Sequence, residues 1–270
     1  MSDRRYALKL DEAEHTRLRA QAAAGARRET EVWNQLGLGA GGHVADLGCG
    51  PGATLLGLVD RVGSSGRLDG VDSDPAAVAR AAEDIAAAGA TEVVSVSQGL
   101  AWDSGLPAAD YDVVIVRLVL VHNGGREQAI VDHAMTLLRP GGLLYLFDID
   151  MTMIRVSPPT PPVTELFTRL ESFERARGND VAVGLRLADL LLAAGAELVD
   201  YRGNCSVYRR HTGQRGPAWS AREAMVADGY ASDDDVARWD REFDNLDAAP
   251  KQPWYINAGF TAIGRRRPTV

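Results

Sequence analysis

Three glycines, Gly48, Gly50 and Gly52, are spaced like those of a loop that binds a nucleotide or nucleoside. They follow the apolar run Val44–Leu47, which predicts a strand leading into the loop. Glycine lets the backbone adopt positive φ and approach a ligand without a Cβ in the way. Asp72 ends the next apolar run, about 20 residues after the loop, where a carboxylate can accept hydrogen bonds from both hydroxyls of a ribose. These residues predict a site for a ligand that contains a nucleoside.

The glycine spacing by itself is compatible with two kinds of cofactor. Gly48-x-Gly50-x-x-Ala53 also satisfies the dinucleotide fingerprint, in which a helix N-terminus holds a pyrophosphate, and an acid after the second strand suits a nicotinamide enzyme too. Asp46 favours a different ligand, because its carboxylate is poorly placed beside a pyrophosphate and matches a ligand with an ammonium and a sulfonium. A helix end and tight turn, predicted at Leu138–Leu143 before a fifth strand, favour the same ligand.

The stretch from Val44 to about Phe147 resembles the core of the class I S-adenosylmethionine-dependent methyltransferases. The motifs that carry this resemblance occur in the family's order: Asp46-Leu47-Gly48-Cys49-Gly50-Pro51-Gly52, Gly70-Val71-Asp72, Tyr111-Asp112-Val113-Val114 and Leu138-Arg139-Pro140-Gly141-Gly142. The resemblance implies S-adenosyl-L-methionine as methyl donor and S-adenosyl-L-homocysteine as product. It also implies an α/β fold, with a Rossmann-like, seven-stranded, mostly parallel sheet whose antiparallel last strand contains Phe260–Arg265, N-terminal helices and helical cap insertions.

One position departs from the family's pattern. After the third strand the family commonly has an acid near the amino group of the adenine, where this chain has Leu100. We therefore expect backbone groups of Leu100 and Ala101 to face the adenine, with Trp102 or Asp103 nearby. The residues expected to bind the donor are Asp46, Gly48, Cys49, Gly50, Gly52, Asp72, Ser73, Leu100, Ala101, Arg117, Tyr6 and Gln21.

The N-terminal segment has a second, weaker resemblance. Tyr6-Ala7-Leu8, Glu14, Arg17-Leu18 and Gln21 resemble the opening of a small-molecule subgroup of this family, as do Gly178-Asn179-Asp180 and Gly184-Leu185-Arg186-Leu187. In such relatives the N-terminal helices fold over the donor as a lid. The resemblance implies that Tyr6 and Gln21 lie near the donor and the acceptor.

His122 is the candidate for acceptor-side chemistry. It follows the apolar stretch Val113–Val121, at the carboxyl end of the fourth strand, and ligands of open α/β sheets bind at that edge. An imidazole with a pKa near neutrality can remove a proton from a hydroxyl or amine. The alternative is a histidine that fixes the turn Asn123–Gly125. Asp148, after the fifth strand, is the second catalytic candidate, to orient or deprotonate an acceptor, and could equally be a turn residue.

The elements that must position these residues alternate between strand and helix. Apolar runs at 44–47, 68–71, 93–96, 113–116 and 143–147 are separated by helical stretches, which indicates βαβ units and a buried parallel sheet. The helix after the second run has Asp74 as cap, Pro75 in its first turn and Gly89 at its end. Later elements are a proline-rich connector at 157–162, helical segments at 163–177 and 185–199, an irregular zone at 209–217, a further helical segment, and a final strand at 255–263.

We predict a helical lid at 1–40 and a donor-binding core at 41–150. Residues 151–270 belong to the same domain as the core and contain helical cap insertions at 151–192 and 209–254, together with the C-terminal strands. The formal net charge of −8 makes nucleic acid an unfavourable partner. Two cysteines indicate a reducing compartment, and the N-terminus and hydropathy predict neither a signal peptide nor a membrane span, so we expect a cytoplasmic protein. No metal-ligand spacing stands out, so no metal is expected.

The sequence therefore predicts in-line methyl transfer to an oxygen, nitrogen or carbon of a small molecule, such as a secondary metabolite. The expected partner is a small-molecule acceptor, and a homodimer is left open. Two rival functions also stay open at this point. One is a methyltransferase-fold cyclase or non-methylating binding protein, and the other is a nicotinamide-dependent oxidoreductase.

Overall fold

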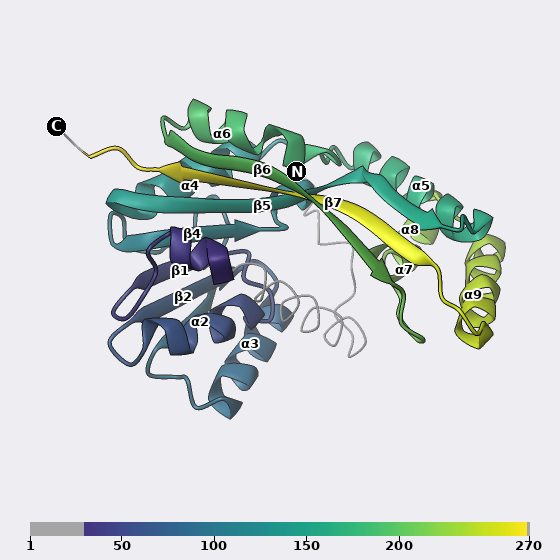
Figure 1. Ribbon diagram of the computed structural model, residues 1–270, viewed down its shortest axis with the longest axis horizontal. Coiled ribbons are helices and arrows are strands. Elements are labelled where there is room, and N and C mark those ends of the chain that lie inside the picture. Colours follow the sequence, from purple (N-terminus) through teal and green to yellow (C-terminus); the bar gives the residue numbers. More distant parts are fainter. Residues whose placement is uncertain (1–29, 269–270) are drawn as a thin grey trace.

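The computed structural model describes residues 30–268, which form one seven-stranded sheet with helices on both faces (Figure 1). The strands are β1 (His43–Leu47), β2 (Arg67–Asp72), β3 (Val94–Gln98), β4 (Tyr111–Arg117), β5 (Leu138–Ser157), β6 (Glu197–Arg209) and β7 (Trp254–Arg265). Their order is β3-β2-β1-β4-β5-β7-β6, and only β7 is antiparallel to its neighbours. The predicted Rossmann-like sheet with an antiparallel last strand is confirmed.

Helices connect the strands and cover the sheet. The α-helices are α2 (Ala53–Val62), α3 (Pro75–Ala87), α4 (Glu127–Leu137), α5 (Pro161–Ala176), α6 (Leu187–Ala193), α7 (Pro217–Ser220), α8 (Arg222–Ala227) and α9 (Asp233–Ala248), and two 3-10 turns are η1 (Leu120–His122) and η2 (Val183–Arg186). Residues 30–35 are also helical. No helix within residues 30–268 is long and apolar enough to cross a membrane.

The helix α3 has the ends that the sequence predicts. The Asp74 side chain accepts a hydrogen bond from the Ala76 N–H (2.9 Å), and Pro75 begins the helix, where its missing N–H costs nothing. Gly89 follows the helix with φ +67°, the left-handed conformation that ends many helices. These local rules place the segment between β2 and β3 without help from the rest of the fold.

The sheet is buried on both faces at β1, β2 and β4. Val44 and Ile115 pack with Leu55 and Leu58 of α2 on one face, whereas Val114 belongs to the larger core on the face of α4, α5 and α6. Since alternate side chains of a strand point to opposite faces, a strand covered on both sides is apolar throughout. This is why the short apolar runs of the sequence predicted these strands well.

The C-terminal part of the sheet differs from the prediction. β5 continues through residues 151–157, which were expected to lie in a helical insertion, and pairs with β7 as far as Ser157↔Trp254. The helix expected at 185–199 is wrong in its limits, because α6 ends at Ala193 and Gly195 (φ +78°) turns the chain into β6. β6 is an edge strand in which no residue is fully buried, so its sequence lacks an apolar signal.

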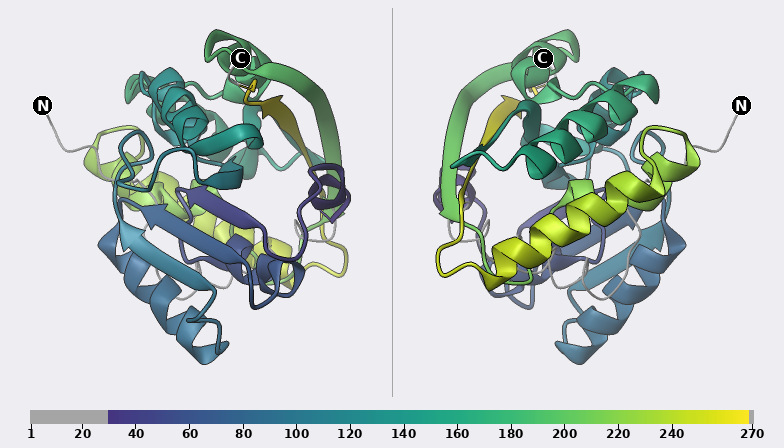
Figure 2. Two further views of the ribbon diagram at one scale, coloured as in Figure 1. Left: turned by 90° about the vertical axis from the view of Figure 1, so that its left-hand side faces the viewer. Right: turned by 90° about the vertical axis from the view of Figure 1, so that its right-hand side faces the viewer.

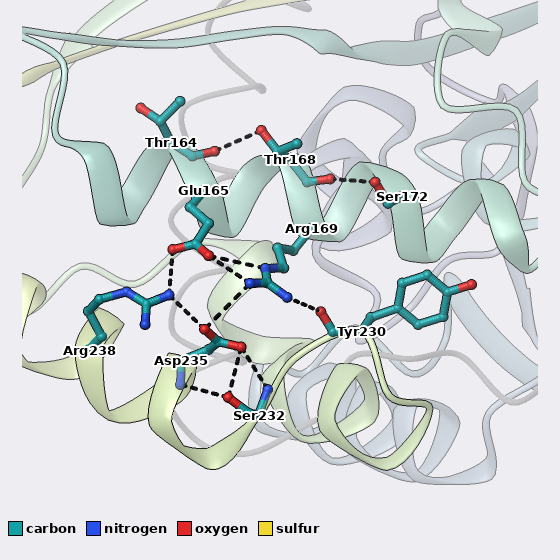
Figure 3. Close-up of polar contacts among 9 residues, drawn as sticks. All are labelled: Thr164, Glu165, Thr168, Arg169, Ser172, Tyr230, Ser232, Asp235 and Arg238. Carbon is teal, nitrogen blue, oxygen red and sulfur yellow. Dashed lines mark hydrogen bonds and ion pairs between the residues drawn. The ribbon is translucent and has the colours of Figure 1, made fainter.

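Beyond the parallel strands, β5, β6 and β7 form a three-stranded arm, and α5 and α9 lie at the end toward which it extends (Figures 1 and 2). A network of charged groups joins these two helices (Figure 3). Glu165 of α5 accepts hydrogen bonds from Arg169 (2.8 Å) and from Arg238 of α9 (2.6 Å), and Arg238 also donates to Asp235 (2.6 Å). Asp235 and Ser232 form a capping box at the start of α9, so the network also fixes that helix end.

Candidate functional site

The glycine loop crosses from β1 to α2 at the carboxyl edge of the sheet. Gly48, Gly50 and Gly52 have φ values of +77°, +53° and +74°, which explains the requirement for glycine. The N–H groups of Gly48 and Cys49 both donate to the Val71 carbonyl at the end of β2 (2.7 and 3.1 Å), so the loop is tied to the neighbouring strand. A Cβ on Gly48 would lie 2.4 Å from a methyl of Val119, so this glycine also permits close packing against the segment after β4.

Asp72 lies beside this loop in a defined orientation. One carboxylate oxygen accepts from the Gly50 N–H (2.8 Å) and the other from the Asp74 N–H (2.9 Å). Burial raises the pKa of Asp72, and these N–H groups act in the opposite direction. The Ser73 N–H also contributes, and a carboxylate can accept about four hydrogen bonds in all. The remaining capacity of Asp72 can accept from a ribose hydroxyl.

Asp46 and Cys49 lie deeper in the loop. Asp46 is 2% exposed. The thiol of Cys49 is buried, and a Cβ on Gly70 would lie 2.8 Å from its sulfur, so the thiol fills the space between the loop and β2. Burial raises the pKa of Cys49, and the charges of Asp46 and Asp72 raise it further, so the thiol keeps its proton. Cys49 therefore serves as a small packing residue of the loop and is a poor nucleophile.

The segment after β3 has a local turn where the adenine contacts were expected. Leu100 and Asp103 exchange backbone hydrogen bonds of 3.4 and 3.0 Å, so both backbone groups of Leu100 already have protein partners. Trp102 stacks against Arg126, with the guanidinium carbon 5.1 Å from the ring centroid. Ser73 lies across from this segment, and its carbonyl accepts from the Gln98 side chain at 3.3 Å.

The end of β4 carries a backbone feature that the sequence did not signal. Leu118 has φ +58°, a conformation that costs a residue with a Cβ about 1–3 kcal/mol and is found mostly at functional sites. Its N–H donates to the Phe147 carbonyl of β5 (2.8 Å), which holds the strained residue in place. Arg117 precedes it and lies over the Phe147 ring at 5.4 Å. The strained residue turns the chain from β4 toward Val119, which contacts the glycine loop.

His122 is half-buried at the end of the turn η1, and Asp148 holds that turn. Asp148 is fully buried, and its carboxylate accepts from the N–H groups of Val121 (3.1 Å) and Ile149 (2.9 Å). Burial raises the pKa of Asp148 to about 7, although these N–H groups lower it. Asp148 lies within β5, so its predicted position after that strand is wrong, and so is the alternative of a turn residue. A side chain with no exposed surface is placed to orient the His122 turn.

The structure thus gathers the glycine loop, Asp72, Arg117 and the His122 turn along one edge of the sheet. Tyr6 and Gln21, the remaining expected donor contacts, lie outside the described residues. Within residues 30–268 no three His, Cys, Asp or Glu side chains cluster closely enough to hold a metal ion.

Comparisons with known proteins agree with this geometry. Residues 44–142 match the family model of a methyltransferase domain. An uncharacterised 37.1 kDa protein in a transposon of Streptomyces fradiae is 32% identical over 171 residues, 63% of this chain and 47% of that protein. The arsenite methyltransferase of Halobacterium salinarum is 31% identical over 113 residues, 42% of this chain and 28% of that protein. The chain therefore spans less than half the length of these curated relatives.

Solved structures share the fold at low identity. A SAM-dependent methyltransferase of Aquifex aeolicus has a TM-score of 0.55 at 20% identity, covering 72% of this chain and 92% of that one. A phosphoethanolamine N-methyltransferase of Haemonchus contortus, in complex with S-adenosyl-L-methionine, has a TM-score of 0.53 at 15% identity, covering 90% and 53%. The 4+2 cyclase SpnF has a TM-score of 0.57 at 18% identity, covering 92% and 82%.

Proposed function

We propose that this chain, in which residues 44–142 match a methyltransferase domain, is a class I S-adenosylmethionine-dependent methyltransferase that transfers a methyl group from S-adenosyl-L-methionine to an oxygen, nitrogen or carbon atom of a small molecule. One observation carries the proposal more than any other. The Asp72 carboxylate is held by the N–H groups of Gly50 and Asp74, which fixes its orientation beside the glycine loop. This arrangement suits a ribose with two free hydroxyls beside a glycine loop.

The remaining residues at this edge fit the donor by charge and by space. Bound S-adenosyl-L-methionine supplies an activated methyl group, so the protein has mainly to align the two reactants and exclude water. Gly48, Gly50 and Gly52 allow the backbone to approach the donor, and Asp46 supplies a negative charge for its cationic end. We keep the backbone of Ala101 as an adenine contact, since both backbone groups of Leu100 are engaged with Asp103.

On the acceptor side, His122 is the group suited to hold or take a proton. It stands on the turn after β4, at the same edge of the sheet as the glycine loop. A hydroxyl or an acidic carbon would need this base, whereas a neutral amine would hardly need one. Asp148 acts through the turn, because its carboxylate binds the backbone at Val121 and has no exposed surface.

A small, uncharged or cationic acceptor suits this chain better than nucleic acid, because the net charge is −8. Arsenite, the acceptor named for one relative, has little support here. Arsenic in this state favours soft thiolate ligands, whereas the chain has two cysteines, Cys49 keeps its proton in the loop, and Cys205 lies on the distant edge strand β6. Free cysteines are usual in a reducing compartment, which supports the cytoplasm as the place of action.

Calorimetry with S-adenosyl-L-homocysteine tests the proposal. We expect the wild-type chain to bind it and Asp72→Ala to weaken binding at least tenfold, since a hydrogen bond to a charged group, worth about 1.5–3 kcal/mol, is lost. Asp74→Ala is the matched control, because it removes a neighbouring carboxylate and keeps the backbone N–H that Asp72 uses. Binding of NADH without binding of S-adenosyl-L-homocysteine would instead identify a nicotinamide enzyme.

Methyl transfer itself needs a separate measurement, since the cyclase SpnF shares this fold and fold alone does not decide the reaction. Incubation with donor labelled in its methyl group and a metabolite extract should yield a labelled small molecule. His122→Ala should lower the rate of labelling and leave the affinity for S-adenosyl-L-homocysteine unchanged. Donor binding without any labelled product would point to a cyclase or a binding protein.

A further inference from the structure

The turn that carries His122 is held from the cap as well as from the sheet. On the sheet side, Asp148 accepts from the Val121 N–H. On the cap side, the Asn179 side-chain oxygen accepts from the Gly124 N–H at 2.9 Å. These two side chains are far apart in the sequence. They bind the backbone of the turn at Val121, immediately before His122, and at Gly124, two residues after it.

The end of α5 places Asn179 by a local rule. Gly178 follows the helix with φ +84°, its N–H donates to the Arg175 carbonyl (2.9 Å), and the Asn179 N–H donates to the Glu174 carbonyl (3.0 Å). This pair of bonds is the Schellman motif, which fixes the direction of the chain after a helix. The backbone of Asn179 is therefore set by α5 and moves with it.

A buried acid then orients the Asn179 side chain. The amide nitrogen donates to a carboxylate oxygen of Glu174, which is 1% exposed. The Gly124 N–H can only donate, so the Asn179 oxygen must face Gly124 and the amide nitrogen must face Glu174. Burial raises the pKa of Glu174, and Asn179 and the charge of Arg177 act in the opposite direction.

The backbones of the two turns also touch. A Cβ on Gly124 would lie 1.9 Å from the Gly178 carbonyl oxygen, so no larger residue fits between them. Within the His122 turn, the His122 N–H donates to the Val119 carbonyl (3.1 Å) and the Asn123 side chain donates to the same carbonyl (2.7 Å). A displacement of Gly124 is therefore passed to His122 through a short, hydrogen-bonded segment.

We propose that Asn179, oriented by Glu174, is a positioning residue for His122 and couples the end of the cap helix α5 to the acceptor side of the site. This inference rests on the proposed function, in which His122 takes a proton from the acceptor. Asn179 touches neither reactant. Its role is to keep the imidazole in the position that the reaction needs, where a misplacement of about 1 Å can cost up to a hundredfold in rate.

Reversal of the hydrogen bond tests the coupling. In Asn179→Asp, the introduced carboxylate faces the Glu174 carboxylate, and at a pH where both are ionised their repulsion pulls the side chain from Gly124. In Glu174→Gln, the new amide can still accept from Asn179, so this single variant is the matched control. In the double variant, the amide at position 174 can donate to the carboxylate at position 179, which restores the link with its polarity reversed.

The readout is the imidazole signal of His122 in the NMR spectrum of histidine-labelled protein, saturated with S-adenosyl-L-homocysteine and assigned with His122→Ala. We expect the signal and its titration midpoint to shift in Asn179→Asp, to stay at the wild-type position in Glu174→Gln, and to return toward it in the double variant. Turnover, measured with the acceptor found by methyl labelling, should follow the same order, with a loss of about tenfold in Asn179→Asp.

A role in stability alone predicts another pattern. The coupling is wrong if Asn179→Asp lowers the melting temperature and leaves the His122 signal unchanged. It is also wrong if the double variant regains the wild-type melting temperature while its His122 signal stays shifted. Should Asn179→Asp not fold, Asn179→Ala carries the same expectation without a new charge. Binding of S-adenosyl-L-homocysteine is measured for every variant. Failure of the wild type to bind would overturn the proposed function, whereas binding by all variants with an unresponsive His122 overturns only the coupling.

Discussion

The His122 turn and the cap helices hold their carboxylates in opposite ways. Asp148, beneath the turn, has no exposed surface and is bonded to backbone N–H groups, and its pKa is raised to about 7. Asp235, between α5 and α9, faces two arginines, and the Arg238 guanidinium lowers its pKa to about 2. The first group is stabilised when it is neutral and the second when it is charged. The two regions should therefore respond in opposite directions to pH.

The two regions also differ in how tightly they are held: the glycine loop and the His122 turn are rigid, whereas the contacts between α5 and α9 are adjustable. The glycine loop and the His122 turn are fixed by short backbone bonds and by close packing at Gly48 and Gly124, where a single methyl group does not fit. The cap is joined by side chains that are partly exposed, with 40% for Arg238 and 36% for Arg169, so salt screens their attraction. The ion pairs between α5 and α9 are therefore weaker than the contacts that fix the glycine loop.

Gly48→Ala should have the largest effect and would test the rigidity of the donor loop. The new Cβ would lie 2.4 Å from Val119 at φ +77°, so strain of about 1–3 kcal/mol adds to overpacking of about 1–3 kcal/mol. We expect a loss of about 2–6 kcal/mol in the free energy of unfolding, measured with denaturant, and weaker binding of S-adenosyl-L-homocysteine. Gly89→Ala, at φ +67° in open space, is the control and should lose only the strain.

Asp148→Asn should change how stability depends on pH. The folded state raises the pKa of Asp148 from 3.8 to about 7, so the stability it contributes is complete below pH 3.8 and is lost as the pH rises through about 7. A shift of about three units corresponds to about 4 kcal/mol. Compared with the variant, the wild type should lose stability between pH 4 and pH 8 by up to that amount. Parallel curves for the two proteins would show that Asp148 stays ionised in the folded state.

Asp74→Ala should have a moderate effect confined to α3. It removes the carboxylate that caps the Ala76 N–H, which costs about 0.5–2 kcal/mol of folding free energy. Binding of S-adenosyl-L-homocysteine should change little, because Asp72 keeps its contacts to the backbone. A loss of affinity as large as that of Asp72→Ala would mean that the order of the whole helix end, rather than the Asp72 carboxylate, governs the donor site.

Arg169→Met should have the smallest effect and tests the adjustable cap. Its partly exposed ion pairs with Glu165 and Asp235 contribute about 0.2–1 kcal/mol. The difference from wild type should shrink in 0.5 M salt, where the Debye length falls to about 4 Å. The lowered pKa of Asp235 gives stability that is present above pH 3.8 and lost as the pH falls toward about 2. A large loss that salt does not alter would place the cap among the rigid parts.

The sequence by itself determined the half of the sheet that carries the glycine loop. Buried parallel strands are apolar on both faces, and helix caps and glycine turns follow local rules. The motif from Asp46 to Gly52 predicts a ligand-binding turn wherever a strand leads into a helix. Asp74, Pro75 and Gly89 marked the limits of α3 correctly for this reason.

Only the tertiary structure decided the acceptor side. β6 is an edge strand with no buried residue, so its sequence gives no apolar signal. β5 continues through residues that were predicted as a helical cap, because its pairing with β7, which also pairs with β6, outweighs the local sequence pattern. Asp148 was expected after its strand and lies buried within it. The hydrogen bond between Gly124 and Asn179 joins residues that are 55 positions apart in the chain. No local sequence pattern can predict it, because only the tertiary fold brings the two residues together.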